Sequence, residues 1–145
     1  MTDNEEKRYA YTVQSKVRAG VLDFCYRPLI DVAVSSNTKS RRFKALVDSG
    51  TEVTVMDMAI AELLEVSTEG RPRGRLVGID EYPKEGFLAP VNLQFEEFDK
   101  VFTFSTLFIQ DLHKNFDIIL GQQDFFLNFN VRFERHKKSF YLSLA

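Results

Sequence analysis

The sequence has little of what stabilises small proteins through covalent bonds or metals. Its 145 residues include one cysteine, two histidines and no tryptophan. Cys25 has no second thiol with which to form a disulfide within the chain, and His113 and His136 do not have a spacing typical of zinc ligands. We therefore expect no disulfide, no bound metal and no cofactor.

Long apolar runs are also missing from the sequence. No stretch approaches the roughly 18 consecutive apolar residues that a membrane helix requires, and residues 1–7 are too polar and acidic for a signal peptide. The net charge of −2 gives no overall attraction to nucleic acid or to an anionic membrane. Basic clusters at residues 39–44, 71–75 and 132–138 have the composition of solvated loops and turns. These features predict a cytoplasmic protein without a nucleic-acid or membrane partner.

The size of the chain suits one globular domain. With 145 residues and 44% hydrophobic content, it is large enough to bury a core but too short for two lobes of ordinary size. We divide it into a polar N-terminal arm over residues 1–18 and a folded domain over residues 19–145. The arm is either disordered or an outer strand, and the sequence leaves both alternatives open.

Apolar residues recur mainly with the two-residue period of half-buried strands. Such strands are predicted near residues 27–35, 42–47, 91–95, 101–109, 129–133 and 140–144. Asp57 is a suitable N-cap for a helix of about two turns over Met58–Leu64. Fourteen phenylalanines are spread along these segments. The pattern predicts an all-β protein with a phenylalanine-rich core.

The segment from Ala45 to Met56 interrupts this pattern with a carboxylate. Asp48, Ser49 and Gly50 stand between two apolar runs, although Asp and Gly are poor strand residues. A strand broken in this way presents the Asp48 side chain at its end. Taken alone, an Asp-Ser-Gly tripeptide is an ordinary β-turn sequence.

Two motifs, some seventy residues apart, indicate that the Asp48 segment is more than a turn. Residues 45–56 resemble the active-site segment of the retropepsin-like aspartic peptidases. In that segment apolar residues precede Asp-Thr/Ser-Gly, which is usually followed by Ala and then by a second apolar run. This chain has Thr51 in place of the Ala. Residues 116–121 resemble the second hallmark of that family, an apolar triplet that ends in Leu-Gly and opens a short helix. By this resemblance Ile119, Leu120 and Gly121 pass beside the catalytic loop and pack against it.

The resemblance implies a fold and an activity. The fold is an all-β, single-domain, closed β-barrel with one or two short helices, acting as half of a two-fold symmetric dimer. The activity is that of an aspartic endopeptidase, in which two carboxylates activate one water. Because the chain has a single motif of this kind, the resemblance implies a homodimer with one Asp48 from each copy at the axis.

The resemblance also assigns roles around Asp48. The Ser49 hydroxyl would bond across the axis to the partner loop, and Gly50 would let the substrate backbone approach closely. Thr51 and Glu52 would face the main chain of a peptide substrate.

Residues 75–91 correspond to the place of the flap, a hairpin that closes over substrate in this family. Val77, Gly78 and Ile79 would contact the substrate from there. An ordinary surface hairpin is the other interpretation of these residues, and the sequence does not decide between the two.

Three rival interpretations accompany the peptidase. The domain could be a non-catalytic dimerisation or peptide-binding module that retains the peptidase fold and binds extended peptides through strand edges. It could also be a peptidase unit processed from a longer polyprotein, and residues 1–20 neither support nor exclude this origin. A different hydrolase is disfavoured because the Gly-x-Ser-x-Gly, His-Glu-x-x-His and P-loop motifs are missing from the sequence.

Overall fold

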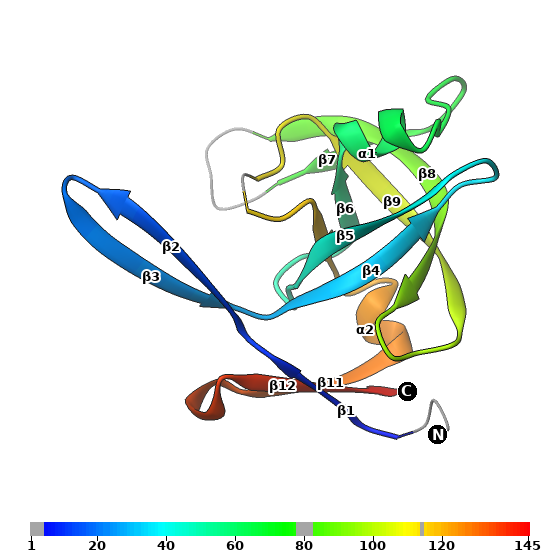
Figure 1. Ribbon diagram of the computed structural model, residues 1–145. Helices are drawn as coiled ribbons and strands as arrows, with labels where there is room; N and C mark the ends of the chain where they lie inside the picture. The colour runs from blue at the N-terminus through cyan, green and yellow to red at the C-terminus, as the bar shows by residue number, and fades with distance from the viewer. Residues whose placement is uncertain (1–4, 78–82, 114) are drawn as a thin grey trace.

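Six strands close a β-barrel in the computed structural model, which describes residues 5–77, 83–113 and 115–145. Each strand is hydrogen-bonded to the next, and pairing between β8 and β4 completes the circle (Figure 1). In barrel order the strands are β4 (Leu29–Ser35), β5 (Ser40–Val47), β10 (Ile118–Leu120), β6 (Thr54–Asp57), β9 (Val101–Ile109) and β8 (Lys84–Phe95). The predicted all-β, closed-barrel fold is confirmed.

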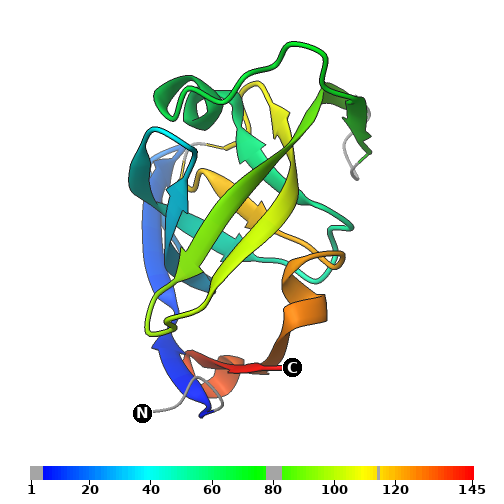
Figure 2. The same ribbon diagram turned by 90° about the vertical axis from the view of Figure 1, so that its right-hand side faces the viewer.

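The long strands β8 and β9 cross one side of the barrel (Figure 2). Their buried positions alternate with exposed ones over most of their length, as the two-residue period predicts. The strand β7 (Arg73–Leu76) pairs with the beginning of β8, at the edge whose far end pairs with β4. This antiparallel β7–β8 pairing agrees with the hairpin predicted across residues 75–91, of which residues 78–82 lie outside the described part of the chain.

Phenylalanine rings fill the centre of the molecule. The Phe95 ring lies 5.2 Å from the rings of both Phe125 and Phe129, in edge-on arrangements that aromatic pairs favour. The fully buried phenylalanines are Phe95, Phe104, Phe108, Phe125, Phe129 and Phe140. The phenylalanine-rich core is confirmed.

Two short helices accompany the barrel. The first, α1 (Met58–Leu63), begins where the Asp57 carboxylate accepts a hydrogen bond from the Ala59 N–H at 2.9 Å, as predicted for its N-cap. The second, α2 (Phe125–Asn128), follows β10 and inserts the buried Phe125 into the core. Neither helix of the described chain is long enough to span a membrane.

A second, three-stranded sheet joins the two ends of the chain below the barrel in Figure 1. It contains β1 (Lys7–Ala10), β12 (Ser139–Leu144) and β11 (Phe129–Glu134) in that order. The 3₁₀ turn η1 (Arg135–Lys137) connects β11 to β12, as expected for the predicted terminal hairpin. Buried Tyr9 ties this sheet to the barrel, since its hydroxyl donates to the Glu96 carbonyl oxygen at 2.5 Å.

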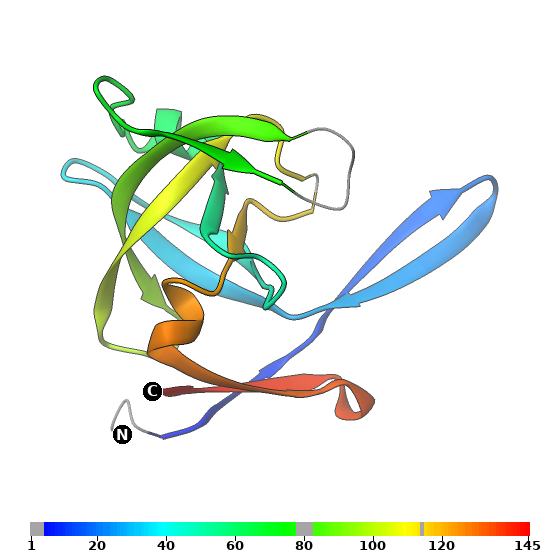
Figure 3. The same ribbon diagram turned by 180° about the vertical axis from the view of Figure 1, so that it is seen from behind.

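An additional hairpin leaves the body of the molecule between this sheet and the barrel. It consists of β2 (Thr12–Arg18) and β3 (Val21–Arg27), joined by a turn at residues 19–20 (Figures 1 and 3). No pattern in the sequence predicted the strand β3. The domain division at residue 18 stays a prediction, and it falls at the last residue of β2.

Candidate active site

Asp48 lies at the point where β5 leaves the barrel. Its backbone N–H donates to the Leu120 carbonyl oxygen at 3.1 Å, which continues the parallel pairing of β5 with β10 by one more residue. The chain then turns and re-enters the barrel at Thr54, the first residue of β6. The half-buried side chain of Asp48 is therefore presented at a strand end, as the sequence predicted.

The loop fixes both oxygens of the Asp48 carboxylate. Oδ1 accepts a hydrogen bond from the Gly50 N–H at 2.9 Å, and Oδ2 accepts one from the Thr51 hydroxyl at 3.1 Å. The Thr51 N–H also donates to the Asp48 carbonyl oxygen at 3.3 Å. Hydrogen bonds to both oxygens leave the carboxylate one preferred orientation. A Cβ at Gly50 would lie 3.2 Å from Oδ1, so glycine also keeps the space beside this oxygen open.

The second motif packs directly against this loop. After β10, the Gln122 N–H donates to the Thr51 carbonyl oxygen at 2.7 Å, and the Gln123 N–H donates to that of Glu52 at 2.8 Å. A Cβ on Gly121 would lie 2.4 Å from the Val53 carbonyl oxygen, a distance that no side chain tolerates. The structure thus brings together two segments that lie some seventy residues apart in sequence, with Ile119 and Leu120 in the strand between β5 and β6.

One residue near the loop was missed by the sequence reasoning. The Gln122 side chain donates from Nε2 to the Ser49 carbonyl oxygen at 2.6 Å, across a sequence separation of 73 residues. The only available signal was its position directly after the Leu-Gly pair. Ser49 itself is exposed, at the tip of the turn.

The residues expected to contact substrate are only partly described. Glu52 is exposed on the loop, and its backbone is tied to the helix-opening segment. Val77 follows β7 and has 74% of its surface exposed. Gly78 and Ile79 lie outside the described residues. The end of β7 and the Asp48 loop lie on the same side of the barrel, on the left in Figure 1 and on the right in Figure 3.

Two acidic residues outside the loop over residues 48–53 have raised pKa values. Desolvation of its partly covered carboxyl, and secondarily the charge of Asp57, raise the pKa of Asp117, the residue before β10. Burial likewise raises the pKa of Asp124, which precedes α2. Within the loop over residues 48–53, the only acid besides Asp48 is the exposed Glu52. The described chain therefore supplies one oriented carboxylate to this place.

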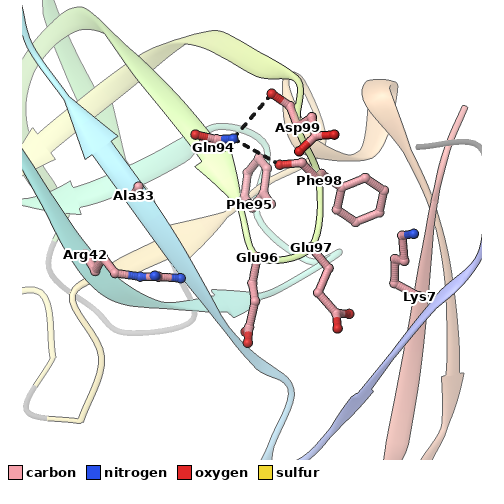
Figure 4. A pocket seen from close by; sticks show the side chains of 9 residues that line it. All are labelled: Lys7, Ala33, Arg42, Gln94, Phe95, Glu96, Glu97, Phe98 and Asp99. Carbon is pink, nitrogen blue, oxygen red and sulfur yellow. Dashed lines mark hydrogen bonds between the residues drawn. The ribbon is translucent and has the colours of Figure 1, made fainter. Parts of the chain in front are cut away.

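A separate hollow of about 460 Å³ lies under the β8–β9 turn (Figure 4). Glu96, Glu97 and Asp99 line it together with Lys7 and Arg42. None of its lining residues belongs to the Asp48 loop. Across residues 5–77, 83–113 and 115–145, no three His, Cys, Asp or Glu side chains are grouped to hold a metal ion.

Comparison with solved structures identifies the architecture. A retropepsin-like aspartic protease from Rickettsia conorii superposes with a TM-score of 0.55 and 14% sequence identity, covering 97% of this chain and 94% of that chain. The EIAV protease in complex with the inhibitor HBY-793 superposes with a TM-score of 0.50 and 21% identity, covering 66% of this chain and 82% of that chain. The chain has the retropepsin-like fold.

The likeness lies in structure and not in overall sequence. No protein-family model matches the chain, and no curated protein matches it. The retropepsin-like fold nevertheless agrees with the resemblance carried by residues 45–56 and 116–121. In this fold the oriented carboxylate of Asp48 and the supporting Leu120–Gly121 segment meet at one point.

Proposed function

We propose that this chain is an aspartic endopeptidase whose active site forms between two identical copies. The observation that carries the proposal is the Asp48 carboxylate, held through both oxygens at a strand end within a retropepsin-like fold. An ordinary turn would not require the Gly121 backbone to press against the same loop. The loop therefore has the construction of a site that positions a carboxylate.

The chemistry requires a second carboxylate. One ionised carboxylate takes a proton from the attacking water, while a protonated partner donates to the carbonyl oxygen of the peptide bond. Two carboxylates close enough to share a water do not both ionise, so the pair keeps one proton over a wide pH range. Because the described loop offers only Asp48, the second carboxylate would come from the partner's copy of the same loop.

The neighbouring residues would complete this site. Exposed Ser49 is available to bond across the two-fold axis to the partner loop, and Thr51 holds the carboxylate in place. Glu52 would contact the main chain of an extended peptide. Val77, with Gly78 and Ile79, would contact it from the β7–β8 side as a flap.

The direct test is cleavage of a diverse peptide library, analysed by mass spectrometry between about pH 4 and pH 7, where a coupled carboxylate pair changes its protonation. Wild-type protein is compared with Asp48→Asn. The variant keeps an oxygen for the Gly50 N–H but loses the ionisable group, so we expect a folded protein with at least about a hundredfold loss of cleavage.

Cleavage by both proteins would assign the activity to another group or to a contaminant. Absence of cleavage by either protein, with both folded and dimeric, would favour the non-catalytic peptide-binding module instead.

A further inference from the structure

The β2–β3 hairpin has one apolar face. Cross-strand partners share a face, and the register pairs Val13 with Tyr26, Ser15 with Phe24 and Val17 with Leu22. Four of these side chains are more than half exposed, with Val17 at 71% and Phe24 at 63%. We call this apolar face, formed by Val13, Val17, Leu22, Phe24 and Tyr26, the arm face.

The opposite face of the hairpin is mainly polar, and it is the face turned toward the barrel at the base. Gln14 Nε2 donates to the Asn115 carbonyl oxygen at 3.1 Å, and the Arg27 guanidinium lies 5.4 Å from the centre of the Phe116 ring. At the same level, the Arg135 guanidinium lies 4.8 Å from the centre of the Tyr26 ring, on the arm face. The base of the hairpin is thus held on both sides, whereas Val17 and Leu22 are exposed near its tip.

An isolated two-stranded hairpin is marginally stable in water, and an exposed apolar patch commonly marks an interface. Two strands of seven residues extend about 23 Å, at about 3.3 Å per residue. Burial of its exposed valine, leucine and phenylalanine side chains against another surface would stabilise the hairpin. The described part of the chain leaves Val17, Leu22 and Phe24 exposed.

The direction of the hairpin indicates what covers it. In Figure 1 it projects to the side of the barrel that carries the Asp48 loop and the end of β7, and the view turned by 90° in Figure 2 shows it offset from both across the barrel. A second copy that brings its own Asp48 to this loop must approach from that side. The hairpin therefore extends toward the space that the second copy would occupy.

We propose that the β2–β3 hairpin is a dimerisation arm, whose arm face packs against a second copy of this chain. This inference rests on the proposed function for the identity of the partner. Stable interfaces bury roughly 800 Å² on each partner, and one face of so narrow a hairpin offers less than that. The arm would therefore extend a contact made around the Asp48 loop, with two arms in a symmetric dimer.

The test is the monomer–dimer dissociation constant, measured by sedimentation over a wide range of protein concentration. Val17→Asp places a charge on the arm face, and Val21→Asp places the same charge on the other face of the hairpin. Both valines are exposed, at 71% and 61%, so neither change should prevent folding. We expect Val17→Asp to raise the dissociation constant at least about tenfold, and Val21→Asp to change it less than about threefold. Thermal unfolding of dilute samples checks that both variants are folded.

Three results would overturn the arm: a wild-type chain that stays monomeric at every concentration, two variants that dimerise equally, or a Val17→Asp dimer as tight as the wild type. The last result would indicate that another protein or peptide covers the arm face. Sedimentation does not depend on activity, so the two proposals fail separately. If the wild type cleaves peptides and Val17→Asp leaves the dissociation constant unchanged, the peptidase proposal stands and the dimerisation arm is rejected. If Val17→Asp weakens the dimer but the wild type cleaves nothing, the dimerisation arm stands and the peptidase proposal is rejected.

Discussion

Gly121 limits how the Asp48 loop can be built. The atom that a Cβ would meet is the Val53 carbonyl oxygen at 2.4 Å, and the Thr51 carbonyl oxygen lies 2.8 Å away. Both belong to the backbone of the loop, so neither can turn aside as a side chain can. A larger residue at this position must therefore move either β10 or the loop that carries Asp48.

We predict that Gly121→Ala lowers the free energy of unfolding by about 1–3 kcal/mol, the usual cost of overpacking. Gly74→Ala is the matched control, because its Cβ would meet the Leu107 side chain, whose Cδ1 lies 2.8 Å away and can rotate. Urea denaturation of both variants measures the difference. Equal stability of the two variants would show that the loop yields more easily than this geometry implies.

Asp117 is expected to make the free energy of unfolding depend on pH. Desolvation and the charge of Asp57 raise the pKa of this carboxyl in the folded protein. A raised pKa means that the folded state holds the proton more tightly than the unfolded chain, so this contribution to stability is lost as the pH rises through the two values. Asp117→Asn should therefore raise the free energy of unfolding near about pH 7, with the gain vanishing below about pH 3. Denaturation curves at both pH values test this, and a gain of the same size at both would contradict it.

At the scale of elements, Asp57 connects three parts of the chain. Its Oδ1 caps α1 through the Ala59 N–H, and its Oδ2 accepts from the Leu112 N–H at 2.9 Å. The cap was predicted from the local sequence. The bond to Leu112 was not, because it joins residues 55 positions apart and no local pattern marks it.

Asp57→Ala should lower the free energy of unfolding by about 2 kcal/mol, since it removes the helix cap and leaves the Leu112 N–H without its acceptor. Asp57→Asn should cost less, because asparagine caps helices about as well as aspartate does. Thermal or urea unfolding of the two variants measures both effects. A cost for Asp57→Asn equal to that of Asp57→Ala would show that the Leu112 bond, and not the cap, accounts for the loss.

The long barrel strands with a buried face were predictable from the sequence, and the hairpin strand β3, which lies outside the barrel, was not. The alternation in β8 and β9 reflects burial against the phenylalanine core, so it is visible in the residues themselves. The strands β2 and β3 pair with each other outside the barrel, and their apolar face is exposed in the single chain. The residues of the candidate site also fall into a predictable and an unpredictable group. Asp48 and Gly121 have sequence motifs, whereas the contact of the Gln122 side chain with Ser49 depends on the tertiary fold.

At the scale of the whole molecule, the proposed peptidase requires two copies of one chain. The described barrel presents a single oriented carboxylate, and in Figure 1 the arm projects to the same side, toward the space for a partner. Both features are incomplete in one copy. A second copy would supply the missing carboxylate and a cover for the arm face.

The most direct measurement is peptide cleavage by mixtures of wild-type and Asp48→Asn subunits after exchange, with substrate in large excess. If each site uses Asp48 from two copies, mixed dimers are inactive. An equal amount of Asp48→Asn should then reduce the activity of a fixed amount of wild type to about half, and further excess should reduce it toward zero. Wild-type activity that is independent of added Asp48→Asn would show that one chain suffices, and would contradict the shared site.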